Sequence, residues 1–160
     1  MLWKGVLPPR GWCALTPLYS SQPHPPRILL AEDDAELRAL LTLALARAGY
    51  AVVALEEGFE LSDYVSLTQV YGGPLLPPDL LLSDVRRPGL TGLDVLAQAR
   101  AAGLFCPVVL LSAFADDAIR EVARRLGASA VLDKPVDLEV LTATVRQELS
   151  MGPRTSEVLP

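Results

Sequence analysis

The stretch DLLLSDVRRPGLTG, residues 79–92, decides the fold predicted for this chain. Its apolar run, Leu80 to Leu82, is too short for a helix and stops at Ser83 and Asp84, just before a proline–glycine segment. A short apolar run bounded by turn residues is typical of a buried strand in a parallel sheet. Asp84 then lies where the strand gives way to a loop, which is where open α/β sheets bind ligands. We therefore take Asp84 as a candidate phosphoryl acceptor.

The same alternation of strand and helix patterns recurs along residues 27–149. Short apolar strands are expected at 28–31, 51–55, 79–83, 107–111 and 128–132. Helical spacing of apolar residues follows at 35–48, 58–71, 91–102, 116–126 and 138–149. Asp34 and Asp137 suit helix N-caps, and Gly49 suits a helix end. With right-handed crossovers, this alternation predicts a doubly wound α/β fold of the flavodoxin type, with a five-stranded parallel sheet in the order 2-1-3-4-5 and helices on both faces.

Length and composition limit the classes of protein to consider. The chain has 160 residues, of which 51% are hydrophobic and 21% charged, as expected for one globular domain. We expect residues 1–26 to form a flexible proline-rich arm, 27–150 the domain, and 151–160 a short tail. No apolar run is long enough for a membrane span, and prolines interrupt any signal-peptide core, so a cytoplasmic protein with no membrane partner is expected.

Charge and cysteine content exclude further classes. The net charge is -5 and no basic stripe is present, so direct nucleic-acid binding is not expected. The two cysteines fit neither a disulfide framework nor a metal site.

Polar residues stand at the same point of four of the predicted strand–helix units. Glu32 and Asp33 follow the first strand, Asp84 the third, Ser112 the fourth and Lys134 the fifth. Because the carboxyl ends of parallel strands share one edge, these side chains are expected to meet. Two carboxylates about 4 Å apart repel by about 1 kcal/mol in water and about 4 kcal/mol at a surface-like dielectric. Such a cluster favours a divalent cation, and its oxygen ligands suit Mg²⁺ or Mn²⁺ better than zinc.

Lys134 is the only lysine between residues 27 and 150, which indicates a need for a compact ammonium group. It can pair with Asp84 and then with an incoming phosphoryl oxygen, while Pro135 can hold the backbone bent, a role that a cis bond would serve. The hydroxyl of Ser112 can donate to a phosphoryl oxygen, or the residue can simply begin the next helix. A carboxylate nucleophile, a cation, a lysine and a hydroxyl together make a phosphoryl-transfer site. No glycine-rich phosphate loop is present, so ATP is not the expected direct donor.

Four motifs give the chain a specific family resemblance: ILLAEDD, LLLSDVRRPGLTG, VVLLSA and LDKP. Residues 27–149 resemble the receiver domain of bacterial two-component response regulators. The resemblance implies phosphorylation of Asp84 by a sensor histidine kinase. It also implies Mg²⁺ (or Mn²⁺) bound by Asp33, Asp84 and the main-chain carbonyl of Arg86, with Glu32 completing the acidic set.

The resemblance further implies slow self-hydrolysis of the acyl phosphate, so we expect a phosphoacceptor rather than a multiple-turnover enzyme. The added charge is expected to draw Ser112 inward and to repack the face formed by the fourth helix, fifth strand and fifth helix. Since only a short tail follows the domain, we expect a stand-alone receiver. It would bind a downstream protein or pass its phosphoryl group to a phosphotransfer protein.

Three features depart from the family pattern. The usual aromatic switch position carries Val131, so signalling through an aromatic side chain would require Phe114 to take that role. Arg86 and Phe114 flank the site and should affect how fast water reaches the phosphoryl group. We therefore expect an altered lifetime of the aspartyl phosphate, without predicting whether it is longer or shorter. The segment 58–78 is longer than usual, which suggests an additional partner surface.

Two other functions are compatible with parts of this pattern. An aspartate-based phosphohydrolase of the haloacid dehalogenase type would share the aspartyl-phosphate chemistry. Such enzymes normally carry a second aspartate two residues after the nucleophile, where this chain has Arg86. A degenerate receiver that only binds partners is the main alternative, and the complete set of acids, serine and lysine argues against it.

Overall fold

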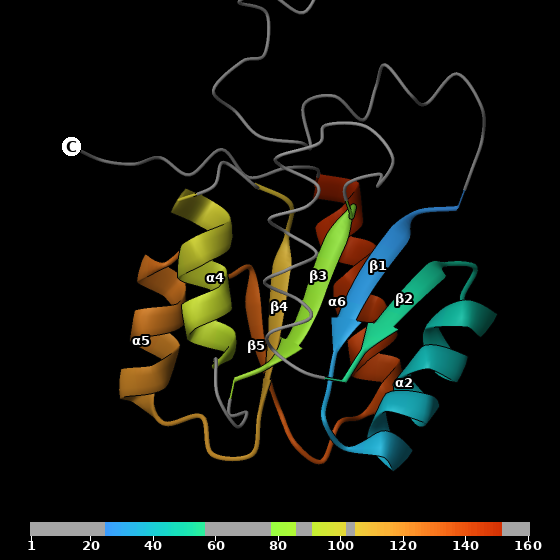
Figure 1. Cartoon of the computed structure of the whole chain (residues 1–160), viewed down its shortest axis with the longest axis horizontal. Coiled ribbons are helices and arrows are strands. Elements are labelled where there is room, and N and C mark those ends of the chain that lie inside the picture. The colour runs from blue at the N-terminus through green and yellow to red at the C-terminus, as the bar shows by residue number, and fades with distance from the viewer. Residues whose placement is uncertain (1–24, 57–77, 86–90, 102–104, 152–160) are drawn as a thin grey trace, which may run out of the picture.

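The computed structural model describes residues 25–56, 78–85, 91–101 and 105–151. The strands in this part of the chain are β1 (Arg27–Ala31), β2 (Ala51–Leu55), β3 (Leu80–Asp84), β4 (Val108–Ser112) and β5 (Ala130–Asp133). The helices are α2 (Ala35–Arg47), α4 (Gly92–Ala101), α5 (Asp117–Arg125) and α6 (Leu138–Met151) (Figure 1). The helix predicted at 58–71 and nearly all of the predicted arm and tail lie outside the described residues, so the division into arm, domain and tail stays a prediction.

The sheet has the predicted order, β2-β1-β3-β4-β5, and every adjacent pair of strands is parallel. The register aligns the carboxyl ends of the strands at one edge, which is the lower edge in Figure 1. There Ala31 lies opposite Ser83, Asp84 opposite Leu111, and Ser112 opposite Asp133. The doubly wound α/β fold class is therefore confirmed.

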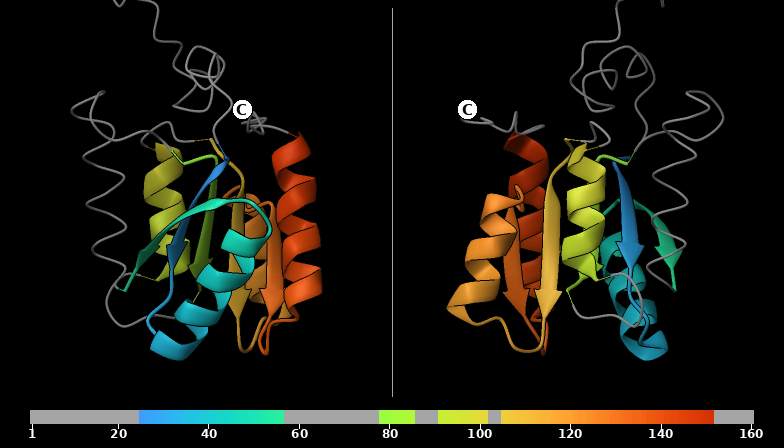
Figure 2. Two further views of the ribbon diagram at one scale, coloured as in Figure 1. Left: turned by 90° about the vertical axis from the view of Figure 1, so that its right-hand side faces the viewer. Right: turned by 60° about the vertical axis from the view of Figure 1, so that its left-hand side comes forward.

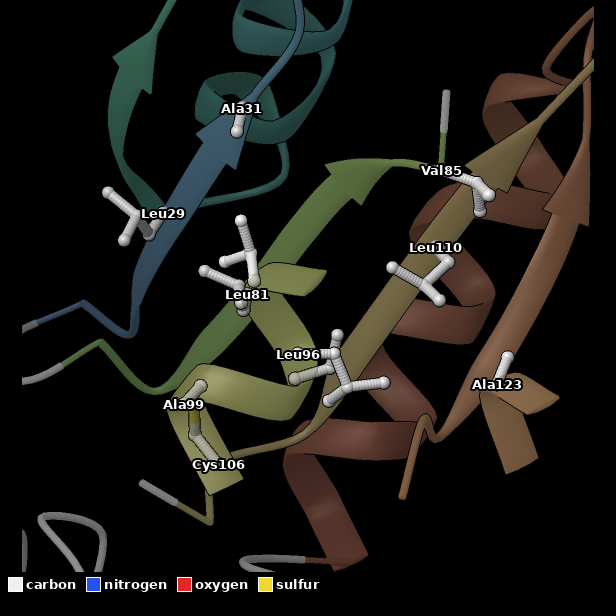
Figure 3. Packing of buried hydrophobic residues seen from close by; sticks show 11 residues of the cluster. Leu29, Ala31, Leu81, Val85, Leu96, Ala99, Cys106, Leu110 and Ala123 are labelled. Atoms are coloured by element: carbon white, nitrogen blue, oxygen red, sulfur yellow. The ribbon is translucent and has the colours of Figure 1, made fainter. Parts of the chain in front are cut away.

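Successive side chains of the central strands enter opposite halves of the core, which explains why these strands are apolar without alternation. Helices α2 and α6 cover one face of the sheet, and α4 and α5 cover the other (Figures 1 and 2). Ile28 and Leu30 pack toward α2 and α6, whereas Leu29 packs toward α4 and α5. Figure 3 shows this second half, in which Leu81, Leu96 and Leu110 pack together. Its buried members are Leu29, Ala31, Leu81, Val85, Val95, Leu96, Ala99, Cys106, Val108, Leu110 and Ala123.

The predicted helix ends are formed by the residues expected there. Asp34 caps α2, its Oδ1 accepting from the backbone N–H groups of Glu36 and Leu37, both at 3.0 Å. The Oδ1 atom of Asp137 accepts from two backbone N–H groups at the start of α6, at 2.8 and 3.1 Å. Gly49 follows α2 with φ +98°, a left-handed conformation that favours glycine.

Strands β3, β4 and β5 each extend one residue beyond the predicted ends. The reason is that backbone pairing continues past the last apolar side chain: the N–H of Val85 donates to Leu111 at 2.8 Å, and that of Lys134 donates to Ser112 at 2.8 Å. Asp84 and Ser112 are thus the last residues of β3 and β4 rather than the first residues of loops. The sheet itself holds these two candidate site residues in place.

Candidate functional site

Three carboxylates meet at the carboxyl edge of the sheet. Glu32, Asp33 and Asp84 each offer an oxygen atom, and these atoms all lie within 4.8 Å of one another. Glu32 has no exposed surface and Asp84 is 5% exposed, whereas Asp33 is exposed. The cluster is therefore open to solvent on the Asp33 side and closed beneath Glu32 and Asp84. Hard oxygen ligands in this number are suited to binding a cation such as Mg²⁺.

Lys134 joins two of these acids across the sheet. Its Nζ lies 2.5 Å from Oδ2 of Asp84 and 2.9 Å from Oε2 of Glu32. Partial burial alone would lower the pKa of Lys134, but the hydrogen bonds from its ammonium group to the two carboxylates outweigh that effect and raise the pKa. Lys134 therefore stays charged at neutral pH, and its side chain is 19% exposed.

Glu32 is held by donors on both of its carboxylate oxygens. Oε2 accepts from Lys134, and Oε1 accepts from the backbone N–H of Asp34 at 3.1 Å. Burial raises the pKa of Glu32, the nearby acids Asp33 and Asp84 add to the rise, and the two donors oppose it. Glu32 thus orients Lys134 as well as contributing to the acidic cluster.

Ser112 lies at the end of β4 and is fully buried. Its Oγ accepts a hydrogen bond from the backbone N–H of Phe114 at 3.3 Å, and Phe114 as a residue is 72% exposed. The Ser112 carbonyl accepts from the N–H of Lys134, so these two candidate residues are neighbours through the backbone. The Lys134–Pro135 peptide bond is cis, in agreement with the bend predicted there.

The sequence also singled out Arg86 and Val131. Arg86 lies outside the described residues, so its expected role as a carbonyl ligand stays a prediction. Val131 packs against the core half under α4 and α5, and its carbonyl accepts from Nη1 of Arg120 at 3.1 Å. Nη2 of Arg120 also pairs with Asp133 at 2.7 Å. An arginine of α5 therefore connects that helix to the strand position that carries Val131 in place of the aromatic residue usual in the family.

Two residues near the site were missed by sequence reasoning. A Cβ atom on Gly92 would lie 2.3 Å from the carbonyl oxygen of Asp84, so only glycine allows α4 to begin this close to β3. The available signal was the glycine that ends the turn segment 88–92. Arg38 of α2 donates from Nη1 to the carbonyl oxygen of Glu32 at 2.8 Å. Nothing in the sequence distinguishes Arg38 from a solvated helix residue.

Comparison with known proteins identifies the family. The response regulator receiver domain family matches residues 28–146. The chain is 36% identical over 120 residues to the transcriptional regulatory protein TctD of Salmonella typhimurium, covering 75% of this chain and 50% of TctD. It is 35% identical over 131 residues to AfsQ1 of Streptomyces coelicolor, covering 82% of this chain and 54% of that protein. It is 32% identical over 123 residues to the DNA-binding transcriptional regulator NtrC of Escherichia coli, covering 77% of this chain and 24% of NtrC.

The chain thus spans only about a quarter to a half of the length of these curated relatives. Among solved structures, the NarL signal receiver domain of Mycobacterium tuberculosis superposes with a TM-score of 0.68 at 25% identity, covering 80% of this chain and 98% of that one. A CheY-like receiver domain of Methanospirillum hungatei gives 0.67 at 21% identity, covering 79% and 95%, which shows the shared fold.

None of the helices in the described part of the chain has the length and apolar character needed to cross a bilayer. The match over residues 28–146 covers well over half of the sequence, and it includes each of the residues gathered at the carboxyl edge. This chain belongs to the response regulator receiver domain family of two-component systems.

Proposed function

We propose that the protein accepts a phosphoryl group on Asp84 from the phosphohistidine of a sensor kinase. A carboxylate oxygen of Asp84 attacks phosphorus, the P–O bond forms, and the P–N bond to the histidine breaks in line with it. The imidazole leaves with its electron pair. The product is an aspartyl phosphate, which water later hydrolyses to phosphate and free Asp84.

The observation that carries this proposal is the position of Lys134. Its ammonium already contacts Asp84 and Glu32, at 2.5 and 2.9 Å, so it can move to a phosphoryl oxygen without leaving the site. That oxygen gains charge as the phosphoryl group is transferred, and a positioned cation stabilises it. Glu32 keeps its hydrogen bond to the Lys134 ammonium group during the transfer.

The residues at this edge also fit the Mg²⁺ expected for the family. Asp33 and Asp84, with the Arg86 carbonyl, would hold the cation, and Glu32 lies close enough to take part. When bound, Mg²⁺ supplies positive charge to the phosphoryl oxygens. The donor set supports this assignment because three carboxylates face one lysine, which leaves an excess of negative charge.

Phosphorylation is proposed to act as a switch on partner binding. The added oxygens would attract the Ser112 hydroxyl, and the change would reach α5, β5 and α6 through the chain that follows β4. The output is binding of a downstream protein or transfer of the phosphoryl group to a phosphotransfer protein, in the cytoplasm and without direct contact with nucleic acid. The role is that of a phosphoacceptor, and stand-alone operation stays a prediction.

The test uses phosphoramidate and Mg²⁺ with the whole chain, followed by intact mass spectrometry. Wild type is expected to gain one phosphoryl group and Asp84→Asn none, while Asp117→Asn, on the exposed start of α5, is labelled as wild type is. Full labelling of Asp84→Asn would contradict the assignment. An unlabelled wild type that also binds no Mg²⁺ would instead favour the degenerate receiver.

A further inference from the structure

Arg38, on the first turns of α2, reaches back to the loop that carries the acids. Its Nη1 donates to the carbonyl oxygen of Glu32 at 2.8 Å and lies 3.4 Å from that of Asp33. Its Nη2 pairs with Oε1 of Glu56 at 3.1 Å. The Arg38 side chain is only 16% exposed, whereas that of Glu56 is 69% exposed. The hydrogen bond to the Glu32 carbonyl is partly buried, whereas the contacts to the Asp33 carbonyl and to Glu56 are exposed.

We propose that Arg38 is a positioning residue for the cation site: it fixes the Glu32–Asp33 backbone so that the Asp33 carboxylate stays beside Asp84. The inference rests on the proposed function, because its consequence is the affinity for Mg²⁺. Arg38 makes this contribution through Asp33 and does not itself contact the cation.

Asp33 needs such support because its side chain is the exposed member of the cluster. The loop that carries it is otherwise held on either side. The N–H of Glu32 donates to Leu55 at 3.1 Å, which extends the pairing of β1 with β2, and Asp34 caps α2. Arg38 bonds the segment between these two anchors. Releasing its carbonyls would let the Glu32–Asp33 peptide rotate, and rotation would carry the Asp33 carboxylate away from Asp84.

The guanidinium group also suits the local charge. The three carboxylates of Glu32, Asp33 and Asp84 outnumber the one ammonium group of Lys134, so the surroundings of this loop carry an excess of negative charge. A planar cation with separate N–H groups can bond several acceptors there at once. Hydrogen bonds to a charged group are shorter and roughly twice as strong as those between neutral groups. A lysine at this position would retain the positive charge. It lacks the branched guanidinium group that contacts the Glu32 carbonyl and the Glu56 carboxylate at the same time.

A second arginine provides a matched control at the other edge of the sheet. Arg100 donates from Nη1 to the carbonyl oxygen of Cys106 at 3.0 Å and from Nη2 to that of Gly127 at 2.8 Å. These acceptors precede β4 and β5, away from the acids. Both arginines thus join a helix to main-chain carbonyls, but only Arg38 does so beside the acidic cluster. Removal of either should destabilise the fold, and only removal of Arg38 should weaken cation binding.

The first measurement is Mg²⁺ affinity by titration calorimetry on the full chain, without any phosphodonor. Changes in groups that orient metal ligands cost about 10–100-fold in affinity, and we expect about 10-fold for Arg38→Ala. Arg38→Lys should remain weaker than wild type, and Arg100→Ala should bind as wild type does. Equal affinity for Arg38→Ala and wild type would overturn the proposal and leave the proposed function intact.

The second measurement reads the loop directly in the metal-free protein. The N–H of Asp34 donates to Oε1 of Glu32, so its hydrogen exchange reports whether the loop keeps its conformation. We expect faster exchange in Arg38→Ala than in Arg100→Ala at matched global stability. This readout needs neither Mg²⁺ nor phosphorylation, so it still decides the role of Arg38 if the proposed function fails. Unchanged exchange at Asp34 would overturn the proposal.

Discussion

The two edges of the same sheet use polar side chains in opposite ways. At the amino edge, side chains bond single backbone groups: Asp79 accepts from the N–H of Arg27 at 2.7 Å, and Ser129 accepts from that of Val108 at 3.3 Å. At the carboxyl edge, carboxylates lie within 4.8 Å of one another and share one lysine. The first arrangement completes the backbone hydrogen bonding of the sheet. The second brings like charges together.

The difference between the two edges distinguishes polar groups that stabilise this fold from polar groups that serve its candidate site. A satisfied backbone N–H adds to the free energy of unfolding, whereas crowded and buried acids reduce it unless a cation neutralises them. Burial raises the pKa of Glu32, which is the expected sign of an acid held in an unfavourable place. Perturbed groups of this kind cluster at functional sites. Removal of an acid should therefore lower the free energy of unfolding at the amino edge and raise it at the carboxyl edge.

The largest effect is expected at Lys134. Breaking a buried ion pair costs about 3–5 kcal/mol, and because Lys134 is 19% exposed we expect Lys134→Ala to lose about 3 kcal/mol in Mg²⁺-free urea unfolding. Added Mg²⁺ should recover part of the loss by neutralising the acids. Arg125→Ala serves as control, since its ion pair with Glu121 is well exposed. A loss no greater than that of Arg125→Ala would contradict this account of the carboxyl edge.

The amino edge should respond to loss of an acid by becoming less stable. Asp79→Ala leaves the partly buried N–H of Arg27 without its side-chain acceptor, which should cost about 2 kcal/mol. Mg²⁺ affinity should not change, because Asp79 lies at the end of the sheet remote from the acids. Urea unfolding and calorimetric titration on the same samples check both statements. Weaker Mg²⁺ binding in this variant would mean that the two edges are not independent.

The carboxyl edge should respond to the same kind of change by becoming more stable. Asp33→Asn removes one of three crowded charges, and we expect a gain of about 1 kcal/mol without Mg²⁺. Mg²⁺ should stabilise wild type through binding to the folded state, but should stabilise the variant much less. Thermal unfolding with and without Mg²⁺ measures both effects. A variant that is less stable without Mg²⁺, yet still stabilised by it, would refute the comparison.

The smallest effect expected is a pH dependence from Glu32. Because the folded-state pKa of Glu32 is raised above its ordinary value, stability associated with its protonated form is present below pH 4.5 and is lost as pH rises through the folded pKa. Glu32→Gln cannot ionise and avoids this loss. The stability of the variant relative to wild type should therefore increase as pH rises from 4.5. A relative stability that falls over this range would show that the carboxylate is favoured in the folded state.

The strand order was predictable because each apolar run could be recognised on its own and strict alternation leaves few arrangements. The gathering of Glu32, Asp84 and Lys134 followed from that order, since all parallel strands end at one edge. The strand ends were misplaced by one residue because backbone pairing does not depend on side-chain polarity. Asp84 and Ser112 pair through the main chain even though their side chains are polar.

The contacts of Arg38 could not have been predicted from the sequence. Its acceptors beside the site are main-chain carbonyls, which leave no sequence pattern, and an arginine in the first turns of a helix is usually solvated. The pairing of Arg120 with the carbonyl of Val131 was hidden for the same reason. Side-chain roles were predictable where several polar residue types had to meet at one edge of the sheet. They were not predictable where the partner of the side chain is a backbone group.

The central claim is that Asp84 itself carries the phosphoryl group. Borohydride reduces an acyl phosphate to an alcohol and leaves a free carboxylate unchanged, so treatment after phosphoramidate and Mg²⁺ should convert the phosphorylated aspartate to homoserine. Peptide mass spectrometry then identifies the modified position. The account predicts homoserine at position 84 in wild type and strongly reduced conversion in Lys134→Ala. Homoserine at another aspartate, with position 84 unmodified, would contradict it.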